Sequence, residues 1–176
     1  MALTNAPQLT TERLELRLPV KADWPAILAM VSHPRTTRFL GSGATSAEHF
    51  ARFCRSAGSW LLYGYGAFTI RRRDLGQVIG NCGIFHTWRG LGPDFDDMPE
   101  AGWVLRHDQE GVGYGHEAMR AVFEWFDSEH GPRRVVCMIA QRNVPSLRLA
   151  RKLGFTPMRE ATLPGGETVG LFERLP

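Results

Sequence analysis

The amino-acid sequence predicts a mixed α/β or α+β fold, in which helices pack on one sheet of parallel and antiparallel strands. Segments with strand-like patterning alternate with segments of helical periodicity along the chain. The 176 residues are 43% hydrophobic and 10% aromatic, which is enough for an ordinary core. That length leaves no room for two full domains, so we expect one domain over residues 1–176.

The first third of the chain is expected to form a strand and two helices. Leu14–Leu18 alternates apolar and charged residues, which is typical of a half-buried strand. A helix follows, with Asp23 as its N-cap and Pro25 in its first turn, and Pro34 ends it. A second, amphipathic helix is predicted over Ser46–Ala57, where apolar residues recur at helical spacing.

The middle of the chain is predicted to contain three strands and one long loop. Two strands lie around Gly66–Arg72 and Val78–Phe85, joined by a turn. Leu91–Pro99 holds three aspartates and two prolines, and we expect it to be an exposed loop. A short strand over Ala101–Leu105 follows, and a cluster of glycines comes after it.

The remaining elements are predicted to be a helix, a strand, a second helix and two strands. The first helix carries an apolar stripe at i, i+3, i+4 and i+7 from Met119, and Gly131-Pro132 stops it. The other four elements are expected at Val135–Ala140, from Pro145 to Gly154, at Phe155–Arg159 and at Thr168–Arg174.

Charge and composition exclude several classes of protein. A net charge of +3 permits an anionic ligand, but it gives no reason to expect direct nucleic-acid binding, and the run Arg71–Arg73 is expected to face solvent. No apolar run reaches the roughly 18–20 residues that a membrane helix needs, so no membrane association is expected. The N-terminal residues do not resemble a secretory signal, and we therefore expect a cytoplasmic protein.

The three cysteines, Cys54, Cys82 and Cys137, are far apart and have apolar neighbours. None of them shows the spacing of metal ligands, so we expect neither a metal site nor a disulfide framework. Buried, unreactive thiols are the simplest expectation for all three.

The most informative segment is Glu110-Gly-Val-Gly-Tyr-Gly-His-Glu117, between a predicted strand and a predicted helix. Glycines let the backbone turn tightly and approach a ligand, and the helix start offers free N–H groups to an anion. A dinucleotide fingerprint starting at Gly111 would need glycine where His116 stands, and a P-loop lysine is absent. The residues alone therefore suit a phosphate or pyrophosphate, and a purely structural turn remains the alternative.

Three segments together resemble the GNAT acetyltransferases, specifically the RimJ/RimL-like branch of ribosomal-protein N-terminal acetyltransferases. They are Leu9–Arg17 with Asp23, Glu100–Leu105 continuing through Gly111–Ala118, and Asn143–Phe155. The segments occur in the family's order and span nearly the whole chain. The resemblance implies one N-acetyltransferase domain whose strongly twisted mixed sheet is flanked by helices, with its fourth and fifth strands splayed to form an acetyl-CoA cleft.

The resemblance also implies where acetyl-CoA binds as co-substrate, without a metal. Its pantetheine would pair with the backbone of Trp103–Leu105, and its pyrophosphate would lie on the amides of the glycine loop. Arg148, Arg151 and Lys152 could assist, or they could form an ordinary solvated face. The expected cofactor-binding residues are Trp103, Val104, Leu105, Gly111, Val112, Gly113, Tyr114, Gly115, His116, Asn143 and Ser146.

An amine acceptor, the usual one in this family, must lose a proton before it attacks, because an alkyl ammonium has a pKa of about 10.4. Glu100 is the first choice for the base, acting directly or through water, because relatives often place a glutamate at the entry of the cofactor strand. The alternative is a solvated loop carboxylate. His86 and His107 are weaker candidates for this role.

Ser146 matches a serine that the RimJ/RimL-like branch carries in the first turn of the corresponding helix. It is the candidate that protonates or positions the leaving thiol, and its alternative is to satisfy N–H groups at the helix start. Asn143 caps the helix, hydrogen-bonds pantetheine, or does both. Two positions depart from the family: Ala150 stands where many members carry tyrosine, and Glu110 begins the glycine loop.

The resemblance therefore predicts an acetyl-CoA-dependent N-acetyltransferase that acts on a primary amine. The acceptor is a small molecule or a peptide N-terminus, a ribosomal protein being one candidate, and the enzyme is a monomer or homodimer. The alternative is a catalytically idle acyl-CoA-binding or regulatory module. We expect the acceptor pocket between the first two helices and the loop before the cofactor strand, where acidic residues would attract a cationic amine. The candidate lining residues are Phe39, Trp60, Tyr63, Trp88 and Asp94–Asp97.

Overall fold

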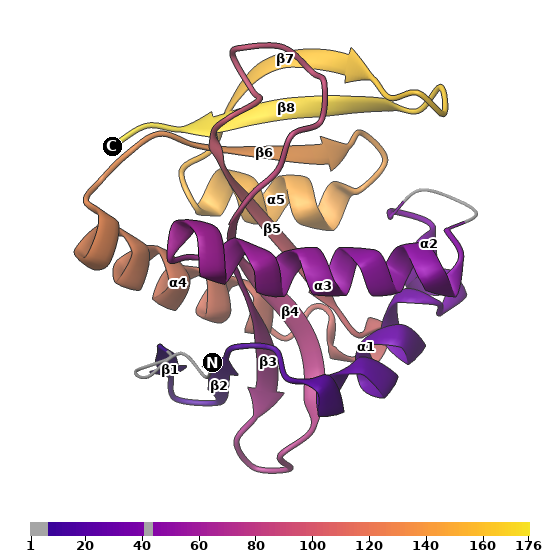
Figure 1. The fold of residues 1–176 in the computed structure, drawn as a ribbon, viewed down its shortest axis with the longest axis vertical. Coiled ribbons are helices and arrows are strands. Elements are labelled where there is room, and N and C mark those ends of the chain that lie inside the picture. Colours follow the sequence, from indigo (N-terminus) through magenta and orange to yellow (C-terminus); the bar gives the residue numbers. More distant parts are fainter. Residues whose placement is uncertain (1–6, 41–43) are drawn as a thin grey trace.

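In the computed structural model, which describes residues 7–40 and 44–176, eight strands form one mixed sheet of order β1-β2-β3-β4-β5-β6-β8-β7 (Figure 1). Neighbouring strands run antiparallel except for β5 and β6, which are parallel. The strands are β1 (Gln8–Thr10), β2 (Leu14–Arg17), β3 (Ala67–Arg72), β4 (Val78–His86), β5 (Pro99–Leu105), β6 (Val135–Ala140), β7 (Thr156–Thr162) and β8 (Thr168–Arg174).

Helices cover both faces of the sheet. Cross-strand partners Thr69, Asn81 and Val104 share one face, and α1 and α3 pack over it. The opposite face, which includes Phe68 and Cys82, packs against α4 and α5. The helices are α1 (Trp24–Val31), α2 (Pro34–Thr37), α3 (Ser46–Tyr63), α4 (Tyr114–His130) and α5 (Val144–Lys152), with 3₁₀ turns at η1 (Lys21–Asp23) and η2 (His107–Gln109).

The two parallel strands separate almost at once. Glu100 of β5 pairs with Val136 of β6, and this is the one register pair between these strands among the described residues. Beyond it, β5 remains paired with β4 while β6 pairs with β8. The splay expected between the fourth and fifth strands is therefore present. These strands are β5 and β6 in the structure, because β1 was not predicted from the sequence pattern.

One predicted helix boundary was wrong, and one short helix was not predicted. The helix expected to end at Ala57 continues to Tyr63, because Ser59 and Trp60 lie buried against the sheet and extend its apolar face. Gly64 ends it in a left-handed conformation with φ of 75°. Pro34 ends α1 as expected but also begins α2, since proline is tolerated in the first turn of a helix.

The predicted exposed loop before β5 is buried at its centre. Phe95 packs among residues of β6 and β8 and is 2% exposed. The Asp96 carboxylate accepts backbone N–H bonds from Arg89, Gly90 and Gly92 at 2.9–3.1 Å. Burial acts to raise the pKa of Asp96, but these donors outweigh it and hold the pKa below its usual range. The expectation of an exposed loop fails because Asp96 satisfies the backbone of its own loop.

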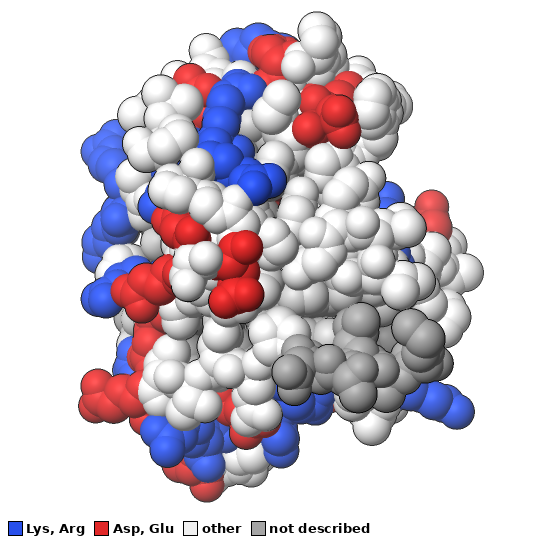
Figure 2. Space-filling view, turned by 60° about the vertical axis from the view of Figure 1, so that its left-hand side comes forward, with Lys and Arg blue, Asp and Glu red and all other residues white. Residues whose placement is uncertain are grey.

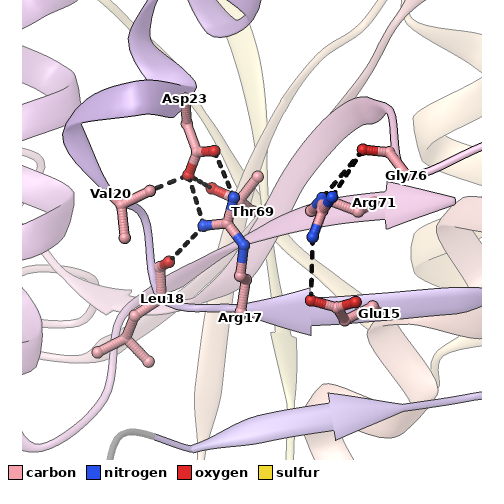
Figure 3. Close-up of polar contacts among 8 residues, drawn as sticks. All are labelled: Glu15, Arg17, Leu18, Val20, Asp23, Thr69, Arg71 and Gly76. Atoms are coloured by element: carbon pink, nitrogen blue, oxygen red, sulfur yellow. Dashed lines mark hydrogen bonds and ion pairs between the residues drawn. The ribbon is translucent and has the colours of Figure 1, made fainter. Parts of the chain in front are cut away.

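Asp23 stands at the N-cap position of α1, but its carboxylate does not cap that helix (Figure 3). It accepts two hydrogen bonds from Arg17, at 2.6 and 2.8 Å, and one from the Thr69 hydroxyl at 3.0 Å. The Val20 N–H adds a fourth bond at 3.0 Å. Burial acts to raise the pKa of Asp23, but these bonds outweigh it and lower the pKa. The cluster joins β2, β3 and the start of α1.

Most arginines are engaged in ion pairs. Eleven of the 19 have a carboxylate oxygen within 4 Å in the described structure. Figure 2 shows acidic and basic side chains interspersed on the left side of the view, whereas much of the right side carries uncharged residues. Arg71 and Arg72 of the three-arginine run pair with Glu15 and Asp74, and Arg73 donates to backbone carbonyls. These three cations are therefore held by contacts within the protein.

Two of the three cysteines fit the expectation of buried thiols. Burial raises the pKa of both Cys82 and Cys137. Cys54 is exposed, so the prediction was wrong there: it lies on the outward side of α3. Over residues 7–40 and 44–176, no three or more His, Cys, Asp or Glu side chains are grouped to hold a metal ion. None of the described helices has the length and apolar character to cross a bilayer.

Candidate active site

A cleft of about 500 Å³ occupies the space where β5 and β6 diverge. On one side it reaches the end of α2 and the middle of α3, at Phe39 and Arg52. On the other side it reaches the start of α5, at Asn143 and Ser146. The cleft therefore connects the two faces of the sheet, and two ligands entering from opposite sides can meet within it.

The free edge of β5 forms one wall of this cleft. Ala101–Leu105 pair with β4 but have no partner on β6 within the described residues. Backbone donors and acceptors on this edge are therefore available to an extended ligand. Trp103 and Val104 line the cleft, whereas the partly buried Leu105 side chain packs against the core.

The glycine loop has the backbone geometry of an anion site. Gly111 and Gly113 have φ of 79° and 90°, which glycine adopts without steric cost, and Gly113 is the N-cap of α4. The N–H groups of Tyr114, Gly115 and His116 have no carbonyl partner in the described part of the chain. Free amides at the positive end of a 17-residue helix favour an anionic group.

Gly115 has a different function from the two glycines before it. A Cβ at this position would lie 3.1 Å from Leu149 Cδ2 and 3.5 Å from Leu105 Cδ1. Glycine therefore allows α4 to pack closely on α5 and β5. Glu110 is exposed at the start of the loop, so its carboxylate lies in solvent.

Arg13 anchors the glycine loop, a contact that sequence reasoning missed. Its guanidinium pairs with Glu117 at 2.6–2.7 Å and donates to the Val112 carbonyl at 3.0 Å. It also lies over the Tyr114 ring, 4.5 Å from the centroid. The Thr11 hydroxyl donates to Glu117 as well, at 2.5 Å. The only signal in the sequence was that Thr11 and Arg13 fall within the N-terminal segment that resembles the GNAT family.

Glu100 lies inside the cleft, at the point where β5 and β6 diverge. It is 3% exposed, so it is not a solvated loop carboxylate. Arg89 donates to both of its oxygens, at 2.6 and 2.7 Å, and the Thr87 hydroxyl donates a third bond. These donors hold the carboxylate in one orientation and occupy part of its hydrogen-bonding capacity.

Ser146 and Asn143 have separate functions at the start of α5. Asn143 is the N-cap, and its Oδ1 accepts the Ser146 N–H at 3.2 Å. The Ser146 hydroxyl does not cap the helix; it accepts the Trp103 indole N–H at 3.1 Å and faces the cleft. Because the hydroxyl oxygen acts as acceptor there, its own proton is free to be donated to a ligand.

The two histidine candidates lie in different surroundings. His86 lines the cleft, but Nδ1 is 3.0 Å from the Tyr65 hydroxyl and Nε2 is 3.0 Å from Asp97. Both of its ring nitrogens are therefore engaged. His107 lies in η2 and stacks on His33 with ring centroids 3.6 Å apart, and it does not line the cleft.

The structure changes the expected acceptor pocket. Phe39 lines the cleft, whereas Trp60 is a buried residue that donates to the Ala67 carbonyl, and Trp88 is exposed elsewhere. The aspartates at 94, 96 and 97 do not line the cleft, and Asp97 reaches its edge only through His86, whose Nε2 lies 3.0 Å from Asp97 Oδ1. Arg52 and Arg55 of α3 line this side instead, and no sequence pattern distinguishes them from other surface arginines.

Comparison with known proteins places the chain in a family. Residues 13–156 match the family model described as the acetyltransferase (GNAT) domain. A GnaT-family acetyltransferase of Bordetella pertussis is 32% identical, with a TM-score of 0.84 over 96% of this chain and 99% of that one. An acetyltransferase of Agrobacterium tumefaciens is 30% identical, with a TM-score of 0.82 over 100% and 98%. The uncharacterized N-acetyltransferase YnaD of Bacillus subtilis is 26% identical over 83% of this chain and 81% of its own.

Ribosomal-protein acetyltransferases are more distant structural neighbours. A structure from Vibrio cholerae described as a ribosomal-protein-serine acetyltransferase is 20% identical, with a TM-score of 0.72 over 97% of this chain and 98% of that one. A RimL structure in complex with coenzyme A is 18% identical, with a TM-score of 0.73 over 96% and 98%. At this level of sequence identity, the likeness shows a shared fold and nothing more specific.

Proposed function

The chain belongs to the GNAT family of N-acetyltransferases, and from that premise we propose that it transfers an acetyl group from acetyl-CoA to a primary amine by direct attack with general-base help. The observation that supports this most directly is the divergence of β5 and β6 after Glu100 and Val136. It leaves a strand edge free beside a cleft that connects the two faces of the sheet. The glycine loop and α4 follow that strand directly.

We propose that acetyl-CoA binds along the free edge of β5, as GNAT acetyltransferases use this co-substrate. The distant RimL relative contains coenzyme A, which supports the same class of ligand here. Two regions would hold it: the backbone of Trp103–Leu105 for pantetheine, and the amides of residues 111–116 for pyrophosphate. Arg148, Arg151 and Lys152 are exposed on α5, and we assign to them a supporting attraction for the phosphates.

Glu100 is the proposed base. Since Arg89 and Thr87 already donate to its carboxylate, we propose that it takes the ammonium proton through an intervening water. The neutral amine nitrogen then forms a bond to the thioester carbonyl carbon, and the carbon–sulfur bond breaks. The surplus proton of the nitrogen passes to the Ser146 oxygen as that hydroxyl gives its own proton to the sulfur, so the products are the amide and the CoA thiol. Ser146 is the proposed donor to the departing thiolate, because its hydroxyl proton is not used within the protein.

A catalytically idle acyl-CoA-binding module is the second candidate. Ala150 occupies the position where many family members carry a tyrosine that acts as proton donor, and Ala150 is 1% exposed. This candidate predicts tight acetyl-CoA binding without turnover. A screen that measures thiol release over small amines and peptide N-termini separates the two: release with any amine supports the enzyme, and cofactor binding with no release across the panel supports the idle module.

The RimJ/RimL-like branch and a protein N-terminus as acceptor form the finer part of the proposal. They rest on the motif segments of the sequence and on the distant likeness to ribosomal-protein acetyltransferases. Comparing peptide N-termini with small amines in the same screen tests this choice, because a protein N-acetyltransferase should acetylate the peptides with the higher kcat/KM.

A further inference from the structure

The acceptor side of the cleft carries two arginines one helical turn apart. Arg52 and Arg55 lie three residues apart on α3, so they project from the same side of the helix, and both line the cleft. They flank the region beside Phe39 and Leu40, on the opposite side of the cleft from α5. Two guanidinium groups placed this way can donate to one oxyanion together.

Neither arginine forms an ion pair within the described residues, in contrast to most arginines of this chain. Within the described structure, neither has a carboxylate within 4 Å or a hydrogen bond from its guanidinium. Residues 1–6 and 41–43 contain no Asp or Glu, so an ion pair with them is excluded by composition. Glu48, one turn before Arg52, accepts the backbone N–H and hydroxyl of Thr45. Its attraction to Arg52 acts without a direct contact between the two side chains.

The carboxylates of the cleft are already in use. Glu100 is bound by Arg89, and Glu167 pairs with Arg142 at 3.2 Å. A polycationic amine entering from the α3 side would therefore meet two free guanidinium groups and no free carboxylate of the lining. Like charges repel, so these two exposed guanidinium groups disfavour polyamines and aminoglycosides on this side of the cleft.

Two uncharged groups extend the same site toward the strands. Ser56 of α3 and Asn81 of β4 line the cleft, and neither side chain hydrogen-bonds to another group in the described residues. An amide and a hydroxyl can orient a polar acceptor without adding charge. Together with Arg52 and Arg55, these two residues line the acceptor side of the cleft.

We propose that Arg52 and Arg55 form an anion subsite, and that the acceptor is a primary amine that also carries a carboxylate or phosphate. The anionic group would bind the two arginines while the amine points toward Glu100. This inference rests on the proposed acetyl transfer and names its substrate class: amino acids, amino phosphates or peptides with an acidic residue near the N-terminus. It replaces the cationic acceptor that the aspartate-rich loop suggested.

Matched pairs of amines test the subsite by steady-state thiol release. The panel comprises free amino acids against their amides, phosphoethanolamine against ethanolamine, and peptides with acidic against amidated residues near the N-terminus. The anionic member of at least one pair should have a kcat/KM about tenfold higher or more. The pair that shows the higher kcat/KM identifies the anionic group as a carboxylate or a phosphate, and the acceptor as a free amino acid or a peptide. Equal or higher kcat/KM for the neutral members throughout the panel overturns the proposal.

The variants Arg52→Gln and Arg55→Gln should raise KM for the preferred anionic amine about tenfold or more, with KM for acetyl-CoA unchanged. The matched control is Arg35→Gln, since Arg35 is also exposed but does not line the cleft. Unchanged KM in both α3 variants counts against the subsite.

If the wild-type protein turns over no amine at all, the acetyl-transfer proposal fails, and the subsite is judged by binding. Isothermal titration with the same matched pairs, in the presence of coenzyme A, should still show that the anionic member binds more tightly and that Arg52→Gln abolishes the difference. No difference within any pair overturns the subsite as well.

Discussion

The Arg13 guanidinium lies 2.6 Å from the Glu117 carboxylate, and this pair joins the hairpin of β1 and β2 to the first turn of α4. The two residues are 104 positions apart in sequence. Arg13 also donates to the Val112 carbonyl, within the glycine loop. Burial acts to raise the pKa of Glu117, but the bonds from Thr11 and Arg13 outweigh it and lower the pKa, so the pair stays ionised at neutral pH. The conformation of the proposed pyrophosphate site thus depends on the N-terminal strands.

We expect Arg13→Ala to raise KM for acetyl-CoA by about tenfold. Without this anchor the loop must become ordered when acetyl-CoA binds, and the entropy lost in ordering it reduces the affinity. kcat should change less, since Arg13 lies outside the cleft lining. Arg120→Ala is the control, because its exposed pair with Glu124 should contribute less than about 1 kcal/mol. Equal KM values for the two variants would contradict an anchoring function.

Gly113→Val should weaken acetyl-CoA binding, which titration calorimetry can measure. The reason is backbone strain: φ at Gly113 is 90°, and a β-branched residue there costs about 1–3 kcal/mol. Steric clash is not the cause, because a Cβ would meet only Arg13 Nη2, at 3.4 Å. Gly165→Val is a useful control, since Gly165 lies outside the loop and has open space around it. Undiminished affinity in Gly113→Val would remove the support for the loop assignment.

Glu100→Gln should lower kcat by about 10²-fold, a typical contribution of a general base, with acetyl-CoA binding intact. The substitution keeps the shape of the side chain but removes the charge that Arg89 neutralises. If Glu100 is the base, the loss should be smaller for an acceptor amine of low pKa, because such an amine is already neutral and needs no base before it attacks. An equal loss of kcat for acceptors of high and low pKa would instead indicate that Glu100 only holds Arg89 and β5 in place.

Ser146→Ala and Trp103→Phe separate proton donation from packing. Both substitutions break the bond between the indole N–H and the hydroxyl, but only Ser146→Ala removes the hydroxyl proton. We expect kcat to fall about tenfold in Ser146→Ala and clearly less in Trp103→Phe. Equal effects on kcat in the two variants would show that the hydrogen bond only positions these side chains and that the hydroxyl proton is not donated. Asn143→Ala tests the helix cap by itself. This variant should lose about 1 kcal/mol of the free energy of unfolding, because the Ser146 N–H loses its acceptor.

The ion pair of Arg17 and Asp23 should make folding stability sensitive to acid. The folded-state pKa of Asp23 is lower than its ordinary 3.8, so its contribution is fully present above that pH and is lost as pH falls through the folded-state value. Asp23→Asn should reduce the free energy of unfolding by about 3 kcal/mol at pH 7, because it leaves Arg17 without its partner. Denaturant titrations at pH 7 and pH 3 should show a smaller difference between variant and wild type at pH 3. A constant difference would contradict this account.

Apart from β1 and α2, the order of the elements could be predicted from the sequence, as could the turn at the glycine loop, because both depend on local properties. β6 and β8 were predicted at their observed bounds, since β6 is a continuous apolar run and the buried Val169 and Leu171 alternate with less buried residues along β8. Gly111 and Gly113 adopt the positive φ that makes glycine necessary there. Ser146 was also identified from its local segment, although its hydrogen bond to Trp103 could not be predicted.

Tertiary structure alone decided which charged groups are neutralised and which remain free. Arg13 meets Glu117, Arg17 meets Asp23 and Arg89 meets Glu100 because strand register and helix packing bring them together. The same packing leaves Arg52 and Arg55 without carboxylate partners beside the cleft. In the sequence, all of these arginines look alike. The energy of a charge depends on its neighbours within a few ångströms, and those neighbours lie far away along the chain.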